Sequence, residues 1–321
     1  MAVLITGAAG FIGSNLVKAL IARGGHVVGF DNLGLGCISN LESVLGHPQF
    51  NFEQIDLSDI DVYREALMRA HADDPITEVW HMAANSDIPA GISDVRTDLR
   101  DTFMTTFNTL EVMRELGICV ILFASSSAIY GDRGGARMVE DTGPLLPISN
   151  YGAMKLASEA AISAATESFI SHAFIFRFPN VIGTPATHGV ILDFVRKLKA
   201  SPGNLVVLGD GTQRKSYLHV EELIDAMIFI RERADGRINV FNIGAGDNGV
   251  TVRFIAEQVV AAVSHEASIT YGKGNKGWVG DVPEFAYSIE KLRALGWEPR
   301  LSSTEAVRRA VREIVEQEAT I

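Results

Sequence analysis

Tyr151 and Lys155 are the residues whose types and spacing point most directly to chemistry. They lie four positions apart in SNYGAMK, about one helical turn, so a helix would place the phenol and the ammonium on one face. A neighbouring positive charge favours the phenolate and lowers the pKa of a tyrosine, which a base working near neutral pH requires. Taken alone, the pattern fits a surface tyrosine beside a helical lysine better, because short motifs match by chance. Its interpretation therefore depends on the surrounding sequence.

An apolar run, Cys119–Ala124, precedes this pair and predicts a strand. Three serines follow directly at its end: Ser125, Ser126 and Ser127. A hydroxyl at a strand end would be placed to hold the oxygen that gains or loses the proton.

Glycines organise the beginning of the chain. The apolar strand predicted over Ala2–Thr6 runs into GAAGFIG at residues 7–13, and a helical pattern continues to Ala22. In this context Gly7 permits a tight turn, Gly10 lets backbone N–H groups approach a pyrophosphate, and Gly13 allows close helix packing. The spacing is GxxGxxG rather than GxGxxG, and a glycine turn alone would equally suit a structural bend.

An acidic residue ends the next predicted strand, His26–Phe30, about twenty residues beyond the glycines. A carboxylate there accepts hydrogen bonds from the adenosine ribose hydroxyls and repels a 2′-phosphate. Asp31, followed by Asn32, therefore predicts NAD rather than NADP as the cofactor. The alternative is a turn, since both residue types favour turns.

Two further strand ends extend the pattern. The strands predicted over residues 51–55 and 78–82 end in Asp56-Leu57 and in Ala83-Ala84. Asp56 would suit the adenine amino group, and the two alanines would let backbone approach the cofactor. Helical segments at 62–72 and 99–116 alternate with these strands, which predicts an α/β, Rossmann-type doubly wound parallel sheet. We expect residues 1–175 to form this domain and 176–321 to form mainly a smaller substrate domain, with some segments returning to the first.

Composition excludes several other classes. The chain has 321 residues, 47% hydrophobic and 21% charged, an ordinary globular balance. Its net charge of −11 disfavours nucleic acid as a partner. The two cysteines, Cys37 and Cys119, and the scattered histidines show no metal-ligand spacing. No window approaches eighteen apolar residues, and no basic segment precedes the first apolar run, which predicts a soluble cytoplasmic protein without a membrane partner.

Taken together, these motifs resemble those of the extended short-chain dehydrogenases/reductases, more narrowly the nucleotide-sugar epimerases and dehydratases, and within them the UDP-galactose 4-epimerases. The resemblance spans nearly the whole chain, and the ordered set is specific where each motif alone is weak. The motifs are GxxGxxG at 7–13, Asp31-Asn32, Asp56-Leu57, HMAA at 81–84, SSSAIYG at 125–131, Tyr151 with Lys155, RFPNVIG at 177–183 and GDGTQRKSYLHV at 209–220.

The resemblance implies residue roles. Tyr151 would be the base, Lys155 would lower its pKa and bind the nicotinamide ribose, and Ser126 would be the third catalytic group. NAD would be contacted by Gly7, Gly10, Phe11, Ile12, Gly13, Asp31, Asn32, Asp56, Leu57, Ala83, Ala84, Tyr151 and Lys155. A nucleotide sugar, by the same resemblance a UDP-hexose, would be contacted by Ser125, Ser127, Asn180, Val190, Arg214, Lys215, Tyr217, Asp281 and Phe285.

Departures from the family pattern limit the substrate assignment. Relatives usually carry arginine where this chain has Lys215 and Trp278, and a lysine cannot reproduce a bidentate guanidinium grip on a diphosphate. A cofactor-side asparagine of relatives corresponds to Thr102. Epimerization of UDP-glucuronate or of a nucleotide heptose therefore stays open beside UDP-glucose and UDP-galactose.

Two other functions fit the same fold. A 4,6-dehydratase would carry an Asp-Glu pair after the catalytic hydroxyl, where this chain has Ser127 and Ala128. A noncatalytic NAD-binding regulator would commonly lose the tyrosine or the lysine, and this chain keeps both.

The resemblance also implies a homodimer, in which the helices at 99–116 and 151–168 pair with their copies. An alanine-rich face on the second helix suits close approach. Phe285 would crowd the C2 substituent of the sugar, which implies poor activity on N-acetylhexosamines.

Overall fold

The computed structural model describes residues 1–275 and 286–320. The chain divides into two compact units. Unit 1 comprises residues 1–131, 143–177 and 227–241, and unit 2 comprises residues 132–142, 178–226 and 242–321.

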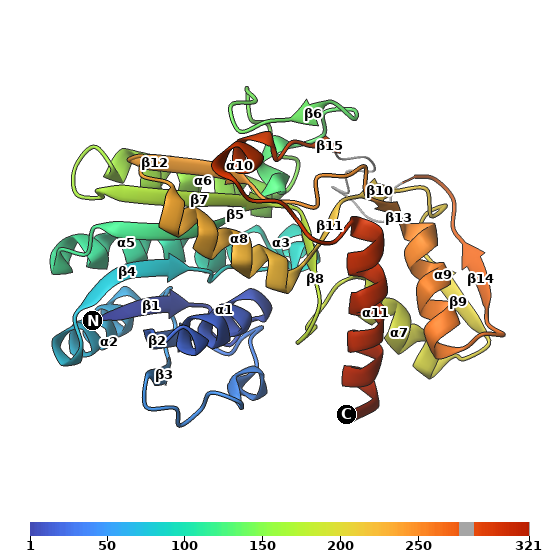
Figure 1. Ribbon diagram of the computed structural model, residues 1–321, viewed down its shortest axis with the longest axis horizontal. Helices are drawn as coiled ribbons and strands as arrows, with labels where there is room; N and C mark the ends of the chain where they lie inside the picture. The colour runs from blue at the N-terminus through green and yellow to red at the C-terminus, as the bar shows by residue number, and fades with distance from the viewer. Residues whose placement is uncertain (276–285, 321) are drawn as a thin grey trace. The chain divides into compact units, whose positions relative to one another are not determined.

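A seven-stranded sheet forms the centre of unit 1, in the order β12-β7-β5-β4-β1-β2-β3 (Figure 1). The pairs from β3 through β2, β1 and β4 to β5 are all parallel. This order contains the 3-2-1-4-5 arrangement of the doubly wound dinucleotide-binding fold. Its strands are β1 (Ala2–Thr6), β2 (His26–Asp31), β3 (Phe50–Gln54), β4 (Ile76–His81), β5 (Val120–Ser126), β7 (His172–Phe178) and β12 (Ile238–Asn242).

Helices cover both faces of this sheet because its central strands are apolar on both sides. One core joins Leu67, Met113 and Ile162, from three different helices, to strand residues such as Val79 and Phe123. Those helices are α2 (Ile60–Asp73), α5 (Thr105–Leu116) and α6 (Asn150–Ala165), and the opposite face carries α1 (Phe11–Ala22) and α8 (Val220–Arg233). Shorter elements of unit 1 are η1 (Ile38–Leu41), α3 (Ile88–Ser93), α4 (Val95–Asp98), η2 (Leu99–Met104) and η3 (Ser127–Tyr130).

The strand register aligns the carboxyl ends along one edge. Thr6 pairs with Phe30 on one side and with His81 on the other, and His81 pairs with Phe123. The segments that follow these four strands therefore begin side by side, although up to 117 positions separate them in sequence. Ligands bind at this edge in doubly wound folds.

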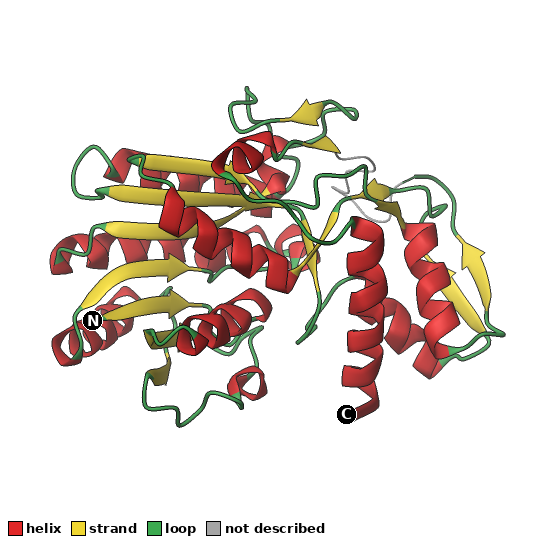
Figure 2. Ribbon diagram, in the orientation of Figure 1, coloured by secondary structure: helices red, strands yellow, loops and turns green. Residues whose placement is uncertain are grey.

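Unit 2 packs three helices around a separate apolar core (Figure 2). These helices are α7 (Val190–Ala200), α9 (Val252–Val263) and α11 (Ser303–Thr320). A capping box begins α11: the N–H of Ser302 donates to Glu305 at 2.9 Å, and the N–H of Glu305 donates to Ser302 Oγ at 3.3 Å. The remaining elements are β6 (Arg137–Met138), β8 (Asn180–Ile182), β9 (Asn204–Val207), β10 (Arg214–Lys215), β11 (Tyr217–His219), β13 (Val250–Thr251), β14 (Ser268–Tyr271), β15 (Ala286–Tyr287) and α10 (Glu290–Leu295).

One predicted element differs in kind. The pattern over residues 99–116 predicts a single helix, but its first part, η2, is a π-helix, and the α-helix α5 starts only at Thr105. The spacing of apolar residues does not distinguish a π-helix from an α-helix over so short a segment, because in both helices the residues on one face recur about once per turn. The other predicted elements of the sheet domain lie within two or three residues of the observed ones.

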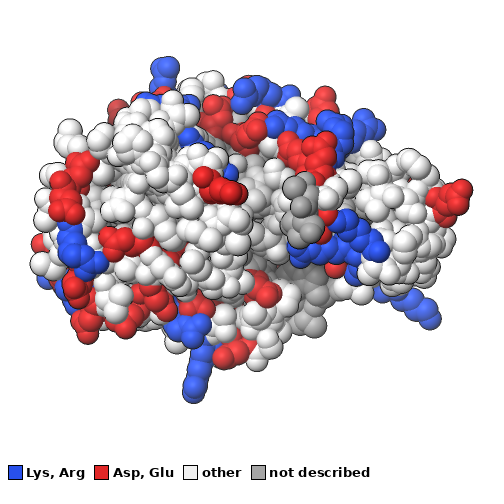
Figure 3. All heavy atoms as spheres, turned by 90° about the horizontal axis from the view of Figure 1, so that it is seen from below, with Lys and Arg blue, Asp and Glu red and all other residues white. Residues whose placement is uncertain are grey.

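Surface charge is mixed on the face drawn in Figure 3, where Lys and Arg side chains are interspersed with Asp and Glu. Among the described residues, no helix is both long and apolar enough to cross a membrane.

His81 is fully buried in unit 1 between two hydroxyls. Its Nδ1 lies 2.8 Å from Thr6 Oγ1, and its Nε2 lies 3.1 Å from Thr106 Oγ1. Burial, aided by the positive charge of Lys155, lowers the pKa of His81 to about 3. The imidazole of His81 is therefore neutral, and it forms hydrogen bonds within the core of unit 1.

This burial predicts a specific loss of stability in acid. The folded protein keeps His81 neutral down to about pH 3, whereas an unfolded histidine titrates near 6.5. Its contribution is therefore complete above pH 6.5 and declines as the pH falls toward 3. We expect the difference in free energy of unfolding between wild type and His81→Gln to shrink by about 2 kcal/mol between pH 7 and 5. Urea unfolding at both pH values measures it, and a pH-independent difference would contradict the prediction.

Candidate active site

The glycine turn between β1 and α1 leaves no room for side chains. A Cβ on Gly7, which has φ +68°, would lie 2.8 Å from the backbone nitrogen of Ala83. A Cβ on Gly13 would lie 1.9 Å from the Gly7 carbonyl oxygen. Gly10 is the N-cap of α1. Because glycine has no side chain, the N-cap residue makes no capping hydrogen bond to the first turn. The N–H groups at Phe11 and Ile12 thus begin a helix whose positive end suits a phosphate.

Asp31 lies against this turn at the end of β2. Its carboxylate accepts hydrogen bonds from the N–H of Ala9 at 2.9 Å and of Leu33 at 2.8 Å. Burial raises the pKa of the carboxyl, and these backbone donors oppose the rise. The carboxylate is held where an adenosine ribose would meet the end of the strand, and Asn32 is exposed beside it.

The ends of β3 and β4 carry the other predicted cofactor residues. Asp56 is exposed and accepts from the N–H and Oγ of Ser58 at 2.9 and 2.8 Å. Leu57 is buried, and its carbonyl accepts from Asn108 of α5 at 2.8 Å. Ala83 and Ala84 are half-buried after β4. The glycine turn, the uncapped α1 and the acidic β2 end together fit a dinucleotide.

Tyr151 and Lys155 share one face of α6, as their spacing predicts. Lys155 is 1% exposed, and its Nζ donates to the Ala124 carbonyl at 2.6 Å. The same nitrogen lies 5.8 Å from the Tyr151 ring centroid and 4.7 Å from that of Phe123. Ser126 at the end of β5 hydrogen-bonds the phenol of Tyr151. Strand end and helix start therefore join the three predicted catalytic groups.

The pKa of Tyr151 differs from the sequence expectation. Burial of the phenol raises its pKa to about 12, while the hydrogen bond with Ser126 works in the opposite direction. Burial also lowers the pKa of Lys155 to about 7, although the negative charges of Glu159 and Asp98 act to raise it. In the protein alone, burial outweighs the hydrogen bond with Ser126, so the expectation of a lowered tyrosine pKa is wrong for this state.

The three serines after β5 have separate environments. Ser125 is fully buried and donates its hydroxyl to the Glu159 carboxylate. Ser126 is partly exposed and meets Tyr151, and Ser127 begins the short helix η3. The hydroxyl of Ser125 is therefore engaged by Glu159 inside unit 1, and its contact with a substrate stays a prediction. Alternation along a strand explains the difference between neighbours.

Sequence reasoning missed several polar side chains close to these groups. Glu159 pairs with Arg177, whose guanidinium also donates to the Tyr130 hydroxyl at 3.0 Å. Asp98 is fully buried and accepts from Asn85 Nδ2 at 2.9 Å. The sequence contained a signal for the pair of Glu159 and Arg177. Glu159 lies four residues after Lys155, so both share one helix face, and Arg177 is a charged residue within an apolar strand.

The predicted sugar-nucleotide residues of unit 2 lie on several elements. Asn180 is exposed at the start of β8, and Val190 is half-buried at the start of α7. Arg214 is exposed on β10 and donates to the Gly249 carbonyl at 3.0 Å, with Lys215 next to it. Tyr217 is 4% exposed in the core of unit 2, which leaves little of its ring for a ligand. Trp278, Asp281 and Phe285 lie outside the described residues.

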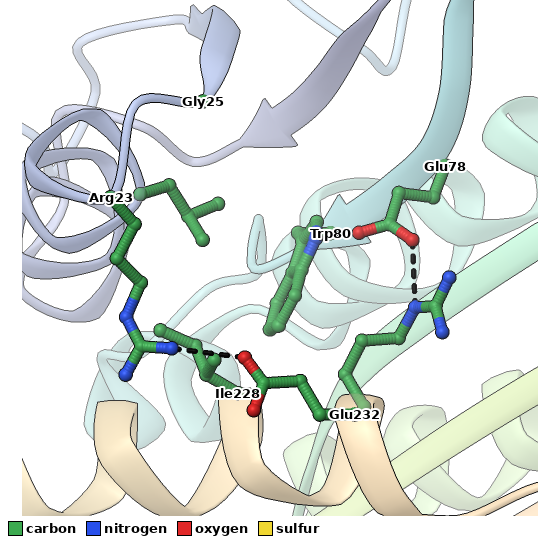
Figure 4. Close-up of a pocket in the computed structure, with 8 residues that line it drawn as sticks. Arg23, Gly25, Glu78, Trp80, Ile228 and Glu232 are labelled. Carbon is green, nitrogen blue, oxygen red and sulfur yellow. Dashed lines mark hydrogen bonds and ion pairs between the residues drawn. The ribbon is translucent and has the colours of Figure 1, made fainter.

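A pocket of about 300 Å³ lies elsewhere in unit 1 (Figure 4). The pocket lies at the C-terminal end of α1, whereas the glycine turn lies at the N-terminal end of the same helix. Arg23 pairs with Glu232 at 3.0 Å and Arg231 with Glu78 at 2.7 Å around it, so its charges are already matched. Trp80 forms its wall and donates to Glu78. Among the described residues, no group of His, Cys, Asp and Glu could hold a metal ion.

Comparisons with known proteins agree with this geometry. The model of the NAD dependent epimerase/dehydratase family matches residues 3–244. A putative UDP-glucose 4-epimerase of Methanocaldococcus jannaschii is 27% identical over 314 residues, covering 96% of this chain and 97% of the relative.

Solved structures extend the comparison. The UDP-glucose 4-epimerase of Thermus thermophilus, solved in complex with NAD, is 31% identical with a TM-score of 0.83, covering 98% of this chain and 99% of that one. The UDP-glucose 4-epimerase of Thermotoga maritima, solved with UDP-glucose, is 26% identical with a TM-score of 0.85 over 100% of both chains. With the glycine turn, Asp31 and the Ser126, Tyr151 and Lys155 group in place, the chain belongs to the NAD dependent epimerase/dehydratase family.

Proposed function

We propose that this protein inverts C4 of a nucleotide sugar, as an NAD-dependent 4-epimerase of the UDP-glucose and UDP-galactose type. The observation that carries the proposal is the meeting of Ser126, Tyr151 and Lys155 at the sheet edge that also bears the glycine turn and Asp31. Relatives and neighbours that carry the name UDP-glucose 4-epimerase support it.

Each catalytic side chain has a defined task in this reaction. Tyr151, as phenolate, removes the proton from the sugar O4, while Ser126 donates a hydrogen bond to that oxygen. Lys155 supplies positive charge close to the phenol. NAD, held along the glycine turn and Asp31, would supply a hydride acceptor for C4, allow return of the hydride to the opposite face, and add positive charge near the phenol. After the return, Tyr151 gives the proton back to O4, so no net oxidation occurs.

The same residues argue against a 4,6-dehydratase. That reaction needs an acid and a base to expel water across C5 and C6. Ser126 is followed by Ser127 and Ala128 in the short helix η3, where the family places the carboxylates. A transient 4-keto sugar can form here, but no carboxylate pair follows Ser126 to carry it further.

The identity of the sugar is tested with a panel of nucleotide sugars. Unit 2 presents Arg214 and Lys215 from β10, and a cationic pair suits the diphosphate common to all candidates. We expect inversion at C4 with UDP-glucose or UDP-galactose from a panel of UDP-, dTDP-, GDP-, ADP- and CDP-sugars. Conversion of UDP-glucuronate or a nucleotide heptose alone would keep the reaction but change the substrate.

Removal of the phenol should separate catalysis from cofactor binding. We expect Tyr151→Phe to abolish epimerization and to leave NAD binding largely intact, because only the proton-carrying oxygen is lost. Ser126→Ala should slow turnover by roughly a hundredfold or more. Tyr271→Phe and Ser163→Ala, outside the site, are the matched controls. Rates with UDP-galactose measure the effect, and near wild-type activity of Tyr151→Phe, or a need for stoichiometric free NAD, would contradict the mechanism.

Neutralising the β2 carboxylate should alter cofactor choice. Asp31→Asn keeps the size and an acceptor but removes the charge that repels a 2′-phosphate. Hydrogen bonds to charged groups contribute about 1.5–3 kcal/mol, so NAD affinity should fall by roughly tenfold or more. NADP affinity should rise relative to NAD. Titration calorimetry of the protein stripped of nucleotide measures both, with the exposed Asp73→Asn as control; an unchanged NAD-to-NADP ratio would show that Asp31 does not read the ribose.

We further propose a homodimer formed through α5 and α6. Phe107 on α5 is 47% exposed, and Ala160 and Ala164 on α6 are exposed small residues that allow close helix approach. Light scattering at micromolar concentration should give twice the mass of the chain, and Ala160→Glu should give the monomer. A monomeric wild type would refute this assembly.

A further inference from the structure

Glu159 carries a buried carboxylate that the mechanism above does not use. It lies on α6 four residues after Lys155 and is 6% exposed. Arg177 of β7 holds it with two donors, Nε to Oε1 at 3.0 Å and Nη2 to Oε2 at 2.7 Å. Ser125 of β5 donates its hydroxyl to the same Oε1. One carboxylate therefore ties together the helix of the proposed base, the strand of the proposed catalytic serine and the neighbouring strand.

The surroundings of Lys155 make this carboxylate one of its two anionic neighbours. Tyr151 shares its helix, Phe123 and the Ala124 carbonyl face it from β5, and neutral His81 faces it from β4. The carboxyls that act on the amine are Glu159 from α6 and Asp98 from α4, and Glu159 acts more strongly. Both favour the charged form of an amine that burial disfavours.

Stability alone does not account for the Glu159 and Arg177 pair. Both members are buried, and a buried ion pair often contributes no more than a well-packed apolar pair would. Its position is informative instead. The negative member is one helical turn from Lys155, and the positive member also donates to the Tyr130 hydroxyl at 3.0 Å.

We propose that Glu159 is a positioning residue for the C4 epimerization, which keeps Lys155 charged and, through Ser125, fixes the strand end that bears Ser126. The inference rests on the proposed function for its kinetic consequence. Its electrostatic part concerns this chain alone. Burial keeps the pKa of Lys155 at about 7 even with both carboxylates present, so loss of one would leave the amine neutral at neutral pH.

The first test measures the pKa of the Lys155 amine directly. In the full-length protein as purified, with lysines labelled at 13Cε, the Lys155 resonance is assigned from its loss in Lys155→Met and followed against pH. We expect Glu159→Gln to lower the Lys155 pKa by roughly one unit or more. Glu167→Gln, which removes an exposed partner of Arg237, is the matched control and should leave the resonance unchanged. An unchanged Lys155 pKa in Glu159→Gln would overturn the proposal.

The second variant separates charge from structure. Glu159→Gln leaves Arg177 buried without its anion, a change that can prevent folding. Glu159→Gln with Arg177→Met removes both charges and fills the space with an apolar chain. If the pair served only to hold the fold, the double variant would regain the wild-type Lys155 pKa. We expect the lowered pKa to persist, because the double variant still lacks the carboxylate that lies one helical turn from Lys155.

The third test is the pH dependence of kcat for epimerization of UDP-galactose. A neutral Lys155 no longer supports the phenolate, so the alkaline fall in activity should move to lower pH in both variants. At pH values above both alkaline midpoints, a Lys155 pKa lower by one unit reduces the rate by about tenfold more, when each rate is expressed relative to that protein's maximum. A loss by the same factor at every pH would show a structural role only. Absence of epimerase activity in the wild type would refute the proposed function, while the Lys155 titration would still decide the role of Glu159.

Discussion

The constraint on which this site depends is the burial of a lysine amine. Lys155 is 1% exposed, and its ammonium has a backbone carbonyl, two aromatic rings and two nearby carboxyls as its described surroundings. Burial of a charge is costly without compensation, so the surrounding polar groups determine whether the amine stays charged. Asp98 and Glu159 reach it from two different helices. Helix α6, which carries Lys155, is therefore linked electrostatically to α4 and, through the contacts of Glu159, to the strands β5 and β7.

Parallel strand register brings the rest of unit 1 to the same edge. Because Thr6, Phe30, His81 and Phe123 are in line, the glycine turn, Asp31, the Ala83-Ala84 segment and the serines leave the sheet together. The turn can approach its neighbours only without side chains, as the 2.8 Å contact of a Cβ on Gly7 with Ala83 demonstrates. The residues proposed for cofactor binding and for catalysis are thus positioned by one feature, the alignment of four strand ends.

Sequence predicts those parts of the site that are local in the chain. The glycine spacing, the acidic end of β2 and the four-residue spacing of Tyr151 and Lys155 each depend on one strand end or one helical turn. The contacts of Glu159 with Arg177 and Ser125, and those of Asp98, join residues 13 to 34 positions apart through the fold, so no periodicity reveals them. The direction of the Tyr151 pKa shift was missed for the same reason. Attraction to Lys155 can be inferred from spacing, whereas desolvation depends on packing that only the structure gives.

The opposite shifts of the two groups define what activation requires. A neutral tyrosine beside a neutral lysine contains the same protons as a phenolate beside an ammonium, so the two forms differ only by one internal proton transfer. In the protein alone, the raised pKa of Tyr151 disfavours the phenolate, and the lowered pKa of Lys155 leaves its amine only partly charged at neutral pH. Any added positive charge, or any donor directed at the phenol oxygen, moves the balance toward the phenolate. In the structure Ser126 already lowers the pKa of the phenol, and a bound cofactor would add such a charge. The phenolate therefore becomes accessible near neutral pH only once the charge of the cofactor is added to the effect of Ser126.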